Sequence, residues 1–197
     1  FNYIRDFGFG QRTGVLLPGE VNGLVWPVSK WSKVSIAQIP MGHGVCVTRL
    51  QMTMAMAALA NHGMLMRPLI VDCLEDSEGN ILGKYGPQAV RQVISTNACR
   101  DMVQALKTVT TKEGTAANAA MEHYTVAGKT GTAQKVEGGT YVQKFISSFI
   151  GFFPADDPEL CISVVLDDPK GSHYGGQTAA PIFKKIAERT ASYLNIR

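Results

Sequence analysis

Residues 126–134 carry the side chains that acyl-transfer chemistry requires. They read Val-Ala-Gly-Lys-Thr-Gly-Thr-Ala-Gln, small and β-branched residues typical of a strand. Side chains alternate between the faces of a strand, so Thr130 and Thr132 would present two hydroxyls to a substrate carboxylate. The ammonium of Lys129 would favour the ionised form of a nearby serine hydroxyl and would attract anionic substrates.

The same strand predicts roles for its backbone. Gly131 has no side chain, so a helix or the substrate could approach the strand closely there. If the strand borders the pocket, the N–H of Thr132 would stabilise a developing oxyanion. We therefore expect Lys129 and Thr132 to be catalytic, and Thr130, Gly131 and Thr132 to bind the substrate.

The same stretch allows two other interpretations, a phosphate-binding loop and an ordinary surface strand. Gly128, Lys129 and Thr130 resemble the end of a phosphate-binding loop, but His123 stands where that motif requires its first glycine. An ordinary surface strand is the second alternative, because short motifs recur by chance. The remainder of the chain argues against it.

Further short blocks follow one another in a fixed order, at residues 7–14, 17–20, 41–45, 47–51, 114–116, 148–154, 168–169, 174–176 and 179–183. Together with the Lys-Thr-Gly motif, they resemble the transpeptidase domain of class B penicillin-binding proteins, bacterial enzymes that cross-link peptidoglycan. The resemblance covers nearly the whole chain. It implies an α+β fold of the penicillin-binding transpeptidase and serine β-lactamase type, with an antiparallel sheet and helices.

The chain departs from the family pattern in its nucleophile. No serine, from Ser29 to Ser192, has a lysine three positions later, so the Ser-x-x-Lys motif is missing. Ser95-Thr96-Asn97 matches the Ser-x-Asn motif, but it comes after the block at 41–45, at a point where the family begins a helix. We expect these residues to cap a helix over 98–108. Residues 1–197 are therefore expected to be the C-terminal portion of a single transpeptidase domain, inactive by itself.

In the complete enzyme, the resemblance implies that an upstream serine attacks the penultimate D-alanine carbonyl of a stem peptide, releases D-alanine and passes the acyl group to a neighbouring amine. β-Lactams would acylate the same serine.

Expected partners are stem peptides, β-lactam antibiotics, the upstream segment of the same protein and other cell-wall synthesis proteins. No metal or organic cofactor is expected. The implied location is the outer face of the bacterial cytoplasmic membrane, with an upstream anchor. The alternative function is a non-catalytic module for binding or assembly.

The amino-acid composition is typical of a globular domain or of a large part of one. The chain has 197 residues, 45% hydrophobic and 18% charged, and a net charge of +3 without a long basic run argues against nucleic acid as a partner. Cys46, Cys73, Cys99 and Cys161 lack the close pairing of zinc or redox sites, and we expect buried, isolated thiols. The apolar stretch at 52–60 is too short to cross a bilayer.

The other polar candidates have weaker support. We expect His43 and His173 to be ordinary loop histidines, although a dyad of His43 with Cys46 is conceivable. The adjacent acids at 156–157 and 167–168 are expected at turns and strand ends, because neighbouring strand residues face apart. The glycines at 8, 10 and 14 do not fit a dinucleotide loop, because Thr13 stands where the third glycine belongs.

Periodicity and turn residues predict the elements that position these groups. We expect loops and short helical pieces over 1–40, helices over 48–61 and 98–111, and a hairpin over 66–82 that turns at 77–80. Strands are expected over 124–135, 147–153 and 160–166, with polar turns at 136–140 and 154–158. A helix over 178–194 would cover the sheet, and no linker divides the chain.

In the isolated chain, we expect apolar faces to be left bare or to be covered by another chain. The predicted inward-facing residues are Leu50, Met54, Ala57 and Ala58 in the first helix, and Ile182, Phe183, Ile186, Ala187 and Tyr193 in the last.

Overall fold

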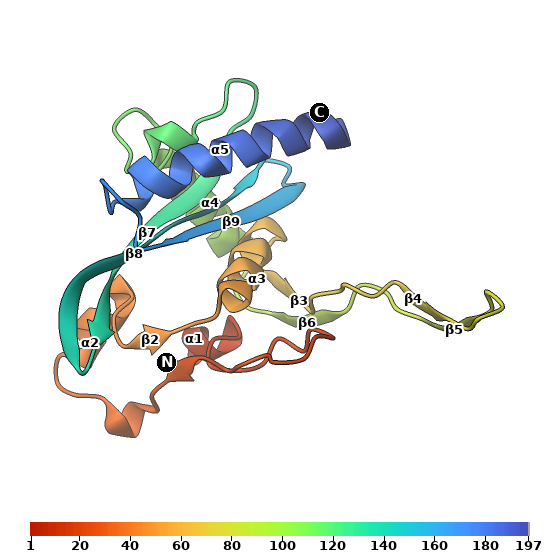
Figure 1. Ribbon diagram of the computed structural model, residues 1–197, viewed down its shortest axis with the longest axis horizontal. Coiled ribbons are helices and arrows are strands. Elements are labelled where there is room, and N and C mark those ends of the chain that lie inside the picture. Colours follow the sequence, from red (N-terminus) through yellow and green to blue (C-terminus); the bar gives the residue numbers. More distant parts are fainter. Residues whose placement is uncertain (197) are drawn as a thin grey trace. The chain divides into compact units, whose positions relative to one another are not determined.

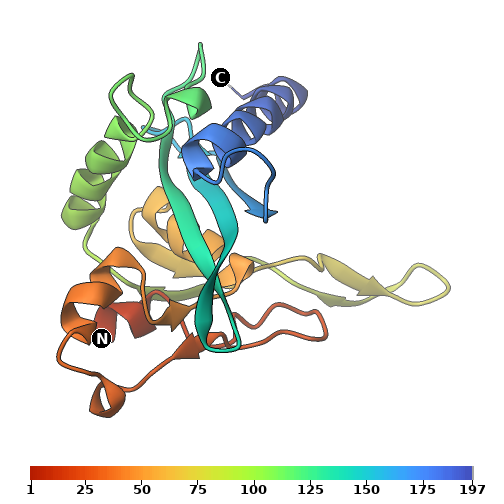
Figure 2. The same ribbon diagram turned by 60° about the vertical axis from the view of Figure 1, so that its left-hand side comes forward.

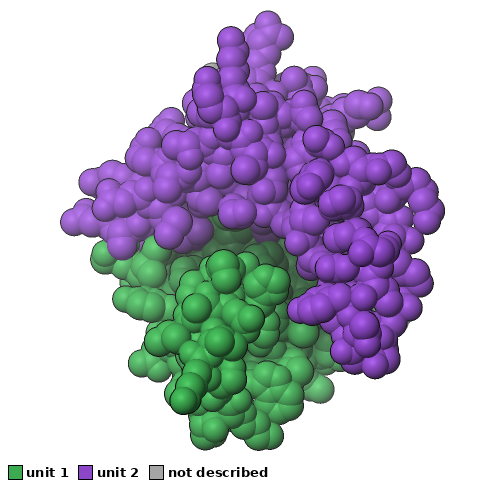
Figure 3. All heavy atoms as spheres, turned by 90° about the vertical axis from the view of Figure 1, so that its left-hand side faces the viewer, with its two compact units in different colours: residues 1–58, 63–95 green, residues 59–62, 96–197 purple. Residues whose placement is uncertain are grey.

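The computed structural model describes residues 1–196. It comprises two compact units, which Figure 3 distinguishes by colour. Unit 1 consists of residues 1–58 and 63–95, and unit 2 consists of residues 59–62 and the chain from Thr96 onward. The chain therefore passes from one unit to the other three times, between residues 58 and 59, between 62 and 63, and between 95 and 96.

Unit 1 combines short helices with two-stranded antiparallel ladders. The ladders pair β1 with β2, β3 with β6 and β4 with β5. The outer pair, β4 and β5, forms an arm that extends from the β3–β6 ladder in Figures 1 and 2. In chain order the elements are α1 (Asn2–Asp6), β1 (Leu24–Val25), η1 (Val28–Lys30), α2 (Ser35–Gln38), η2 (Ile39–Met41), β2 (Val45–Cys46), α3 (Arg49–Ala60), β3 (Met64–Met66), β4 (Cys73–Glu75), β5 (Ile81–Lys84) and β6 (Ala89–Gln92).

The start of α3 is fixed by a reciprocal pair of hydrogen bonds. The Gln51 N–H donates to Thr48 Oγ1 at 3.1 Å, and the Thr48 N–H donates to Gln51 Oε1 at 2.9 Å. This arrangement is a capping box, which satisfies two backbone donors at the helix start. The predicted inward face was only partly right, because Ala58 is buried but the other three predicted residues are partly exposed. The buried positions are Gln51, Ala55, Met56 and Ala58.

The turn of the arm is organised by one carboxylate. Asp76 Oδ1 accepts hydrogen bonds from the N–H groups of Glu78 and Asn80, both at 2.9 Å. Such a side-chain bond to the backbone two residues on is an Asx turn. The predicted turn at 77–80 is confirmed, whereas the strand before it is shorter than predicted, beginning at Cys73, and the strand after it continues to Lys84, beyond the predicted end at 82.

Unit 2 is a three-stranded antiparallel sheet with helices. Its elements are α4 (Thr96–Thr108), η3 (Ala117–Ala119), β7 (Ala127–Glu137), β8 (Thr140–Phe153), β9 (Leu160–Asp167) and α5 (Gly175–Leu194). The strand order is β7-β8-β9, and α5 lies across one face of the sheet in Figures 1 and 2. The predicted sequential antiparallel strands are therefore confirmed.

The hairpin of β7 and β8 is longer than predicted. Residues 136–140 were expected to form a turn, but Glu137 pairs with Thr140 and only Gly138 and Gly139 form the loop. Both glycines have positive φ, at 60° and 82°, as a tight two-residue hairpin turn requires. β8 thereby begins at Thr140 rather than at Ser147.

The core of unit 2 lies between the sheet and α5. The rings of Phe149 and Phe183 meet edge to face at 4.8 Å, and both side chains are fully buried. Three of the five predicted inward residues of α5 are wrong: Tyr193 is 84% exposed, Ile186 is 42% exposed and Ile182 is 37% exposed. The helix instead buries small residues, which let its backbone approach the sheet closely. Its buried positions are Gly175, Gly176, Ala179, Ala180, Phe183, Ala187 and Ala191.

The expectation of four buried thiols was also wrong. None of the four cysteines forms a disulfide bond; Cys46 is exposed, Cys73 and Cys161 are partly exposed, and only Cys99 is buried. The Cys99 Sγ donates to the Leu59 carbonyl at 2.8 Å. Although Cys161 is partly exposed, the apolar surroundings of its thiol disfavour the charged form and raise its pKa to about 12, so this thiol stays protonated at neutral pH.

Candidate active-site strand

The Lys-Thr-Gly-Thr sequence lies in the first half of β7, at one side of the sheet. β7 pairs with β8 and, among the described residues, has no strand on its other edge. Its register sets Thr130 opposite Phe149, Gly131 opposite Ser148 and Thr132 opposite Ser147. The motif therefore sits on a strand whose outer edge offers unpaired backbone groups to a ligand.

Thr130 and Thr132 share the face of the sheet that α5 covers. Thr130 lies opposite Phe149, whose ring packs on α5, and Thr132 Oγ1 accepts a hydrogen bond from the N–H of Gly175 at 3.3 Å. Thr130 Oγ1 lies 3.2 Å from Thr115 Oγ1. The two threonine hydroxyls thus lie together, each beside a second polar group of unit 2.

Lys129 extends from the strand with its side chain exposed. Its Nζ donates a hydrogen bond to the Thr130 carbonyl at 2.9 Å. An ammonium has three donors, so this bond leaves capacity for a second partner. The strand therefore presents one cation and two hydroxyls within four consecutive residues.

The start of α5 lies close to the backbone of the motif at Gly131. A Cβ built on Gly175 would lie 2.6 Å from the Gly131 carbonyl oxygen and would collide with the Ser148 carbonyl. A Cβ on Gly131 would itself collide with Ser148 Oγ. The absence of a side chain at Gly175 lets the start of α5 contact the backbone of the motif, whereas its absence at Gly131 leaves room for the Ser148 side chain.

The start of α5 brings a positive helix end to this site. Its N-cap residue, Tyr174, makes no side-chain capping hydrogen bond, and the first turn contains no acidic residue. The first N–H groups of a helix lack intrahelical partners and carry the positive end of the helix dipole. α5 has 20 residues, and its first N–H group contacts the Thr132 hydroxyl. An anion bound at this hydroxyl would therefore lie at the positive end of a long helix, which is a favourable position for negative charge.

Other predicted polar residues have structural roles. His173 stacks on Phe145 with ring centroids 4.2 Å apart, and its carbonyl accepts a hydrogen bond from the buried Ser147 hydroxyl. Ser95 immediately precedes α4, whereas Thr96 and Asn97 lie inside this helix, which begins two residues earlier than predicted. His43 and Cys46 lie in unit 1, and both are exposed.

The paired acids are held by lysines. Asp156 forms an ion pair with Lys107, and Asp167 forms one with Lys135. Asp168 forms a third with Lys170, at 3.2 Å. These pairs agree with the expectation that the acids occupy turns and strand ends rather than an acid/base site.

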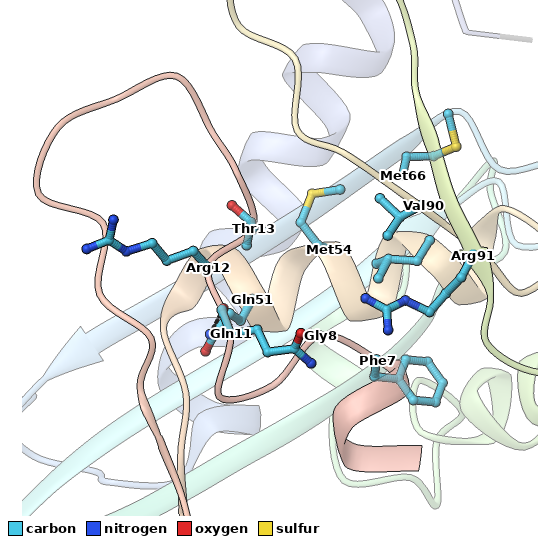
Figure 4. A pocket seen from close by; sticks show the side chains of 11 residues that line it. Phe7, Gly8, Gln11, Arg12, Thr13, Gln51, Met54, Met66, Val90 and Arg91 are labelled. Carbon is cyan, nitrogen blue, oxygen red and sulfur yellow. Dashed lines mark hydrogen bonds between the residues drawn. The ribbon is translucent and has the colours of Figure 1, made fainter. Parts of the chain in front are cut away.

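A small cavity in unit 1 provides no comparable chemistry. Figure 4 shows it around Gln51, next to Gln11 and Met54. Its volume is about 50 Å³, far below that of a typical ligand pocket. The donors of the Gln51 amide already have partners within the chain, because Nε2 donates to the carbonyls of Gln11 and Asn22 at 2.6 and 2.9 Å. Gln51 therefore joins loops together.

Two further negative findings concern the described residues. Within residues 1–196, no group of three or more His, Cys, Asp or Glu side chains is arranged to hold a metal ion. No helix in that part of the chain combines the length and apolar character needed to cross a membrane.

Sequence reasoning missed the two groups that contact the threonine hydroxyls. Thr115 and Gly175 were recognised as parts of the blocks at 114–116 and 174–176, but no role was assigned to either. Their positions depend on tertiary packing. The order of the blocks gave the only signal that they belong with the motif.

Comparison with known proteins agrees with this architecture. Residues 1–188 match the family model described as the penicillin binding protein transpeptidase domain. Stage V sporulation protein D of Bacillus subtilis is 42% identical over 200 residues, covering 100% of this chain and 31% of that protein. Peptidoglycan D,D-transpeptidase FtsI of Escherichia coli K12 is 32% identical, covering 96% of this chain and 31% of FtsI. The chain thus spans about a third of the length of these relatives.

Solved structures show the same fold. Penicillin binding protein 3 of Mycobacterium tuberculosis, complexed with aztreonam, has a TM-score of 0.91 and 35% identity, covering 99% of this chain and 46% of that chain. The transpeptidase domain of Burkholderia pseudomallei penicillin-binding protein 3 has a TM-score of 0.86 and 32% identity, covering 99% of this chain and 57% of that one. The predicted α+β fold is confirmed, and the chain belongs to the transpeptidase domain family of class B penicillin-binding proteins.

Proposed function

We propose that this chain is the Lys-Thr-Gly-bearing part of a serine-type peptidoglycan D,D-transpeptidase that β-lactams acylate. The observation that carries the proposal is the edge strand β7, which presents Lys129, Thr130 and Thr132 together in a family of transpeptidase domains. Relatives named as peptidoglycan D,D-transpeptidases, and relatives crystallised with aztreonam and ampicillin, support it.

Each residue of the motif has a role in this proposal. Lys129 assists a serine supplied by the family's upstream Ser-x-x-Lys segment, because a nearby ammonium favours the ionised hydroxyl. Thr130 and Thr132 donate hydrogen bonds to the substrate carboxylate. Gly131 keeps the strand accessible, and the Thr132 N–H contributes to the oxyanion hole.

The reaction follows from these roles. The serine attacks the carbonyl of the penultimate D-alanine of a stem peptide, D-alanine leaves, and the acyl group passes to an amine of a neighbouring peptide. A β-lactam would form the analogous acyl-enzyme. This activity belongs on the outer face of the bacterial cytoplasmic membrane, with an anchor and other cell-wall synthesis proteins as partners.

Labelling with a fluorescent penicillin tests the proposal. A longer protein that joins this chain to the family's serine-bearing segment should be labelled covalently, and preincubation with unlabelled penicillin should block the label. The 197-residue chain alone should stay unlabelled, because it has no Ser-x-x-Lys motif. Labelling of the isolated chain would contradict the assigned mechanism. A folded longer protein that takes up no label would favour a non-catalytic module.

A further inference from the structure

The hydroxyl of Thr132 has a fixed hydrogen-bond direction. The Gly175 N–H donates to Thr132 Oγ1 at 3.3 Å, and a backbone N–H can only donate. The Thr132 hydroxyl is therefore the acceptor in this bond, and its own proton is available for another partner. A carboxylate, which only accepts, is a suitable partner for that proton.

The hydroxyl of Thr130 has an analogous neighbour in Thr115. The two Oγ1 atoms lie 3.2 Å apart, and either hydroxyl can donate to the other. A carboxylate bound to Thr130 must accept the Thr130 proton, so Thr115 must then donate to Thr130. The resulting chain runs from Thr115 through Thr130 to the carboxylate, and each bond in such a chain polarises the next.

The backbone that carries Thr115 is held firmly. A Cβ on Gly176 would collide with the Thr115 carbonyl oxygen, so the start of α5 packs directly on this residue. The next residue, Ala116, is buried and its N–H donates to the Val109 carbonyl at 2.8 Å. Asn118 Nδ2 donates to the Gly176 carbonyl at 3.1 Å. The Thr115 side chain remains exposed above this packed segment.

We propose that Thr115 is a positioning residue of the transpeptidase site, which acts through Thr130 and favours ligands that carry an anionic carboxylate over neutral ones. The inference rests on the proposed function and deepens it. Thr115 and the Gly175 N–H act in parallel, since each donates to one threonine hydroxyl and leaves that hydroxyl as a donor. The site thereby offers two aligned donors to an acceptor-only group.

The test uses the longer, serine-bearing protein and two probes, benzylpenicillin and its neutral methyl ester. Thr115→Val removes the hydroxyl while keeping the shape, and Thr115→Ala is a second hydroxyl-free variant. Thr115→Ser keeps the donor. Thr111→Val is the matched control, because Thr111 is exposed in the same connection and its hydroxyl bonds only the Thr108 carbonyl among the contacts described. The second-order acylation rate constant is measured for each protein with each probe.

We expect Thr115→Val and Thr115→Ala to slow acylation by benzylpenicillin about threefold to tenfold, the range for one hydrogen bond. Acylation by the ester should change less than about twofold, and Thr115→Ser and Thr111→Val should match the wild type with both probes. If the rate constant with benzylpenicillin stays at the wild-type value in both hydroxyl-free variants, the positioning role is overturned. Equal losses with both probes would overturn it too, because they would indicate a structural effect. A wild-type protein that neither probe acylates would overturn the proposed function itself, and this inference with it.

Discussion

Lys129 is the residue on which the proposed chemistry depends most. Its exposed ammonium donates to the Thr130 carbonyl at 2.9 Å and has donors left for a serine. Lys129→Ala in the serine-bearing protein should slow acylation by penicillin about 100-fold or more, the scale observed when one electrostatic donor is removed from an active site.

Lys135 provides the matched control for this substitution. It lies on the same strand but forms an ion pair with Asp167, away from the motif. Lys135→Ala should leave the acylation rate constant within about twofold of the wild type, because exposed ion pairs contribute little. Near-normal acylation of the Lys129→Ala protein in stopped-flow measurements would remove Lys129 from the site.

Glu20 predicts a dependence of stability on pH. Burial alone would raise the pKa of Glu20, but hydrogen bonds from Thr13 and Gly14 and the charge of Arg12 outweigh it, so its pKa lies below the ordinary value. The Thr13 N–H and hydroxyl both donate to Glu20 Oε1 at 2.6 Å. The bound carboxylate therefore stabilises the fold above its unfolded pKa, and this stabilisation is lost as the pH falls through the lower, folded pKa.

Glu20→Gln should lower the free energy of unfolding by about 1 kcal/mol at pH 7, as expected for lost hydrogen bonds to a charged group at a partly exposed site. The difference from the wild type should shrink below about pH 4 and vanish in stronger acid. Urea unfolding at a series of pH values measures it, with Glu78→Gln in the exposed turn of the arm as the control. A difference that stays constant with pH would show that the carboxylate charge is not the cause.

At the scale of elements, the contact between α5 and the segment at 114–116 depends on Gly176. Alanine normally stabilises a helix relative to glycine by about 1 kcal/mol. Gly176→Ala should nevertheless destabilise the protein by roughly 1–3 kcal/mol, because its Cβ would collide with the Thr115 carbonyl oxygen.

Gly83→Ala is the comparison for this prediction. A Cβ on Gly83 meets nothing within 4 Å, so its effect should stay within about 0.5 kcal/mol. Thermal unfolding of the two variants measures both changes. Equal stability of Gly176→Ala and the wild type would mean that α5 does not pack on Thr115 as described.

The sequence was most informative where a pattern is local. The turn of the arm was predicted because residues 77–80 are typical turn formers, and the order β7-β8-β9 followed from short connections. The first half of β8 was missed although it contains the strand-favouring residues Tyr141, Val142 and Phe145, and although Gly138 and Gly139 are a recognised signal for a two-residue hairpin loop.

The buried face of α5 was mispredicted for a physical reason. The prediction chose large apolar residues such as Ile186 and Tyr193, whereas the helix lies so close to the sheet that alanines fill most of the contact. In the same way, the Lys-Thr-Gly-Thr stretch was found from its residue types, but its partners Thr115 and Gly175 come from distant parts of the chain. Tertiary packing brings these groups together, and no local sequence pattern predicts that contact.

At the scale of the whole molecule, the chain belongs to the transpeptidase domain family and carries no Ser-x-x-Lys motif of its own. The described residues supply a sheet, a covering helix and an edge strand with one cation and two hydroxyls. The central claim is that these parts belong to a D,D-transpeptidase rather than to a binding module.

The most direct test of that claim is the release of D-alanine from a stem pentapeptide that ends in D-alanyl-D-alanine, measured with the complete serine-bearing protein. The account predicts release that stops after preincubation with penicillin and that falls about 100-fold or more in the Lys129→Ala variant. A folded protein that releases no D-alanine, or one whose release is indifferent to penicillin and to Lys129→Ala, would contradict the account.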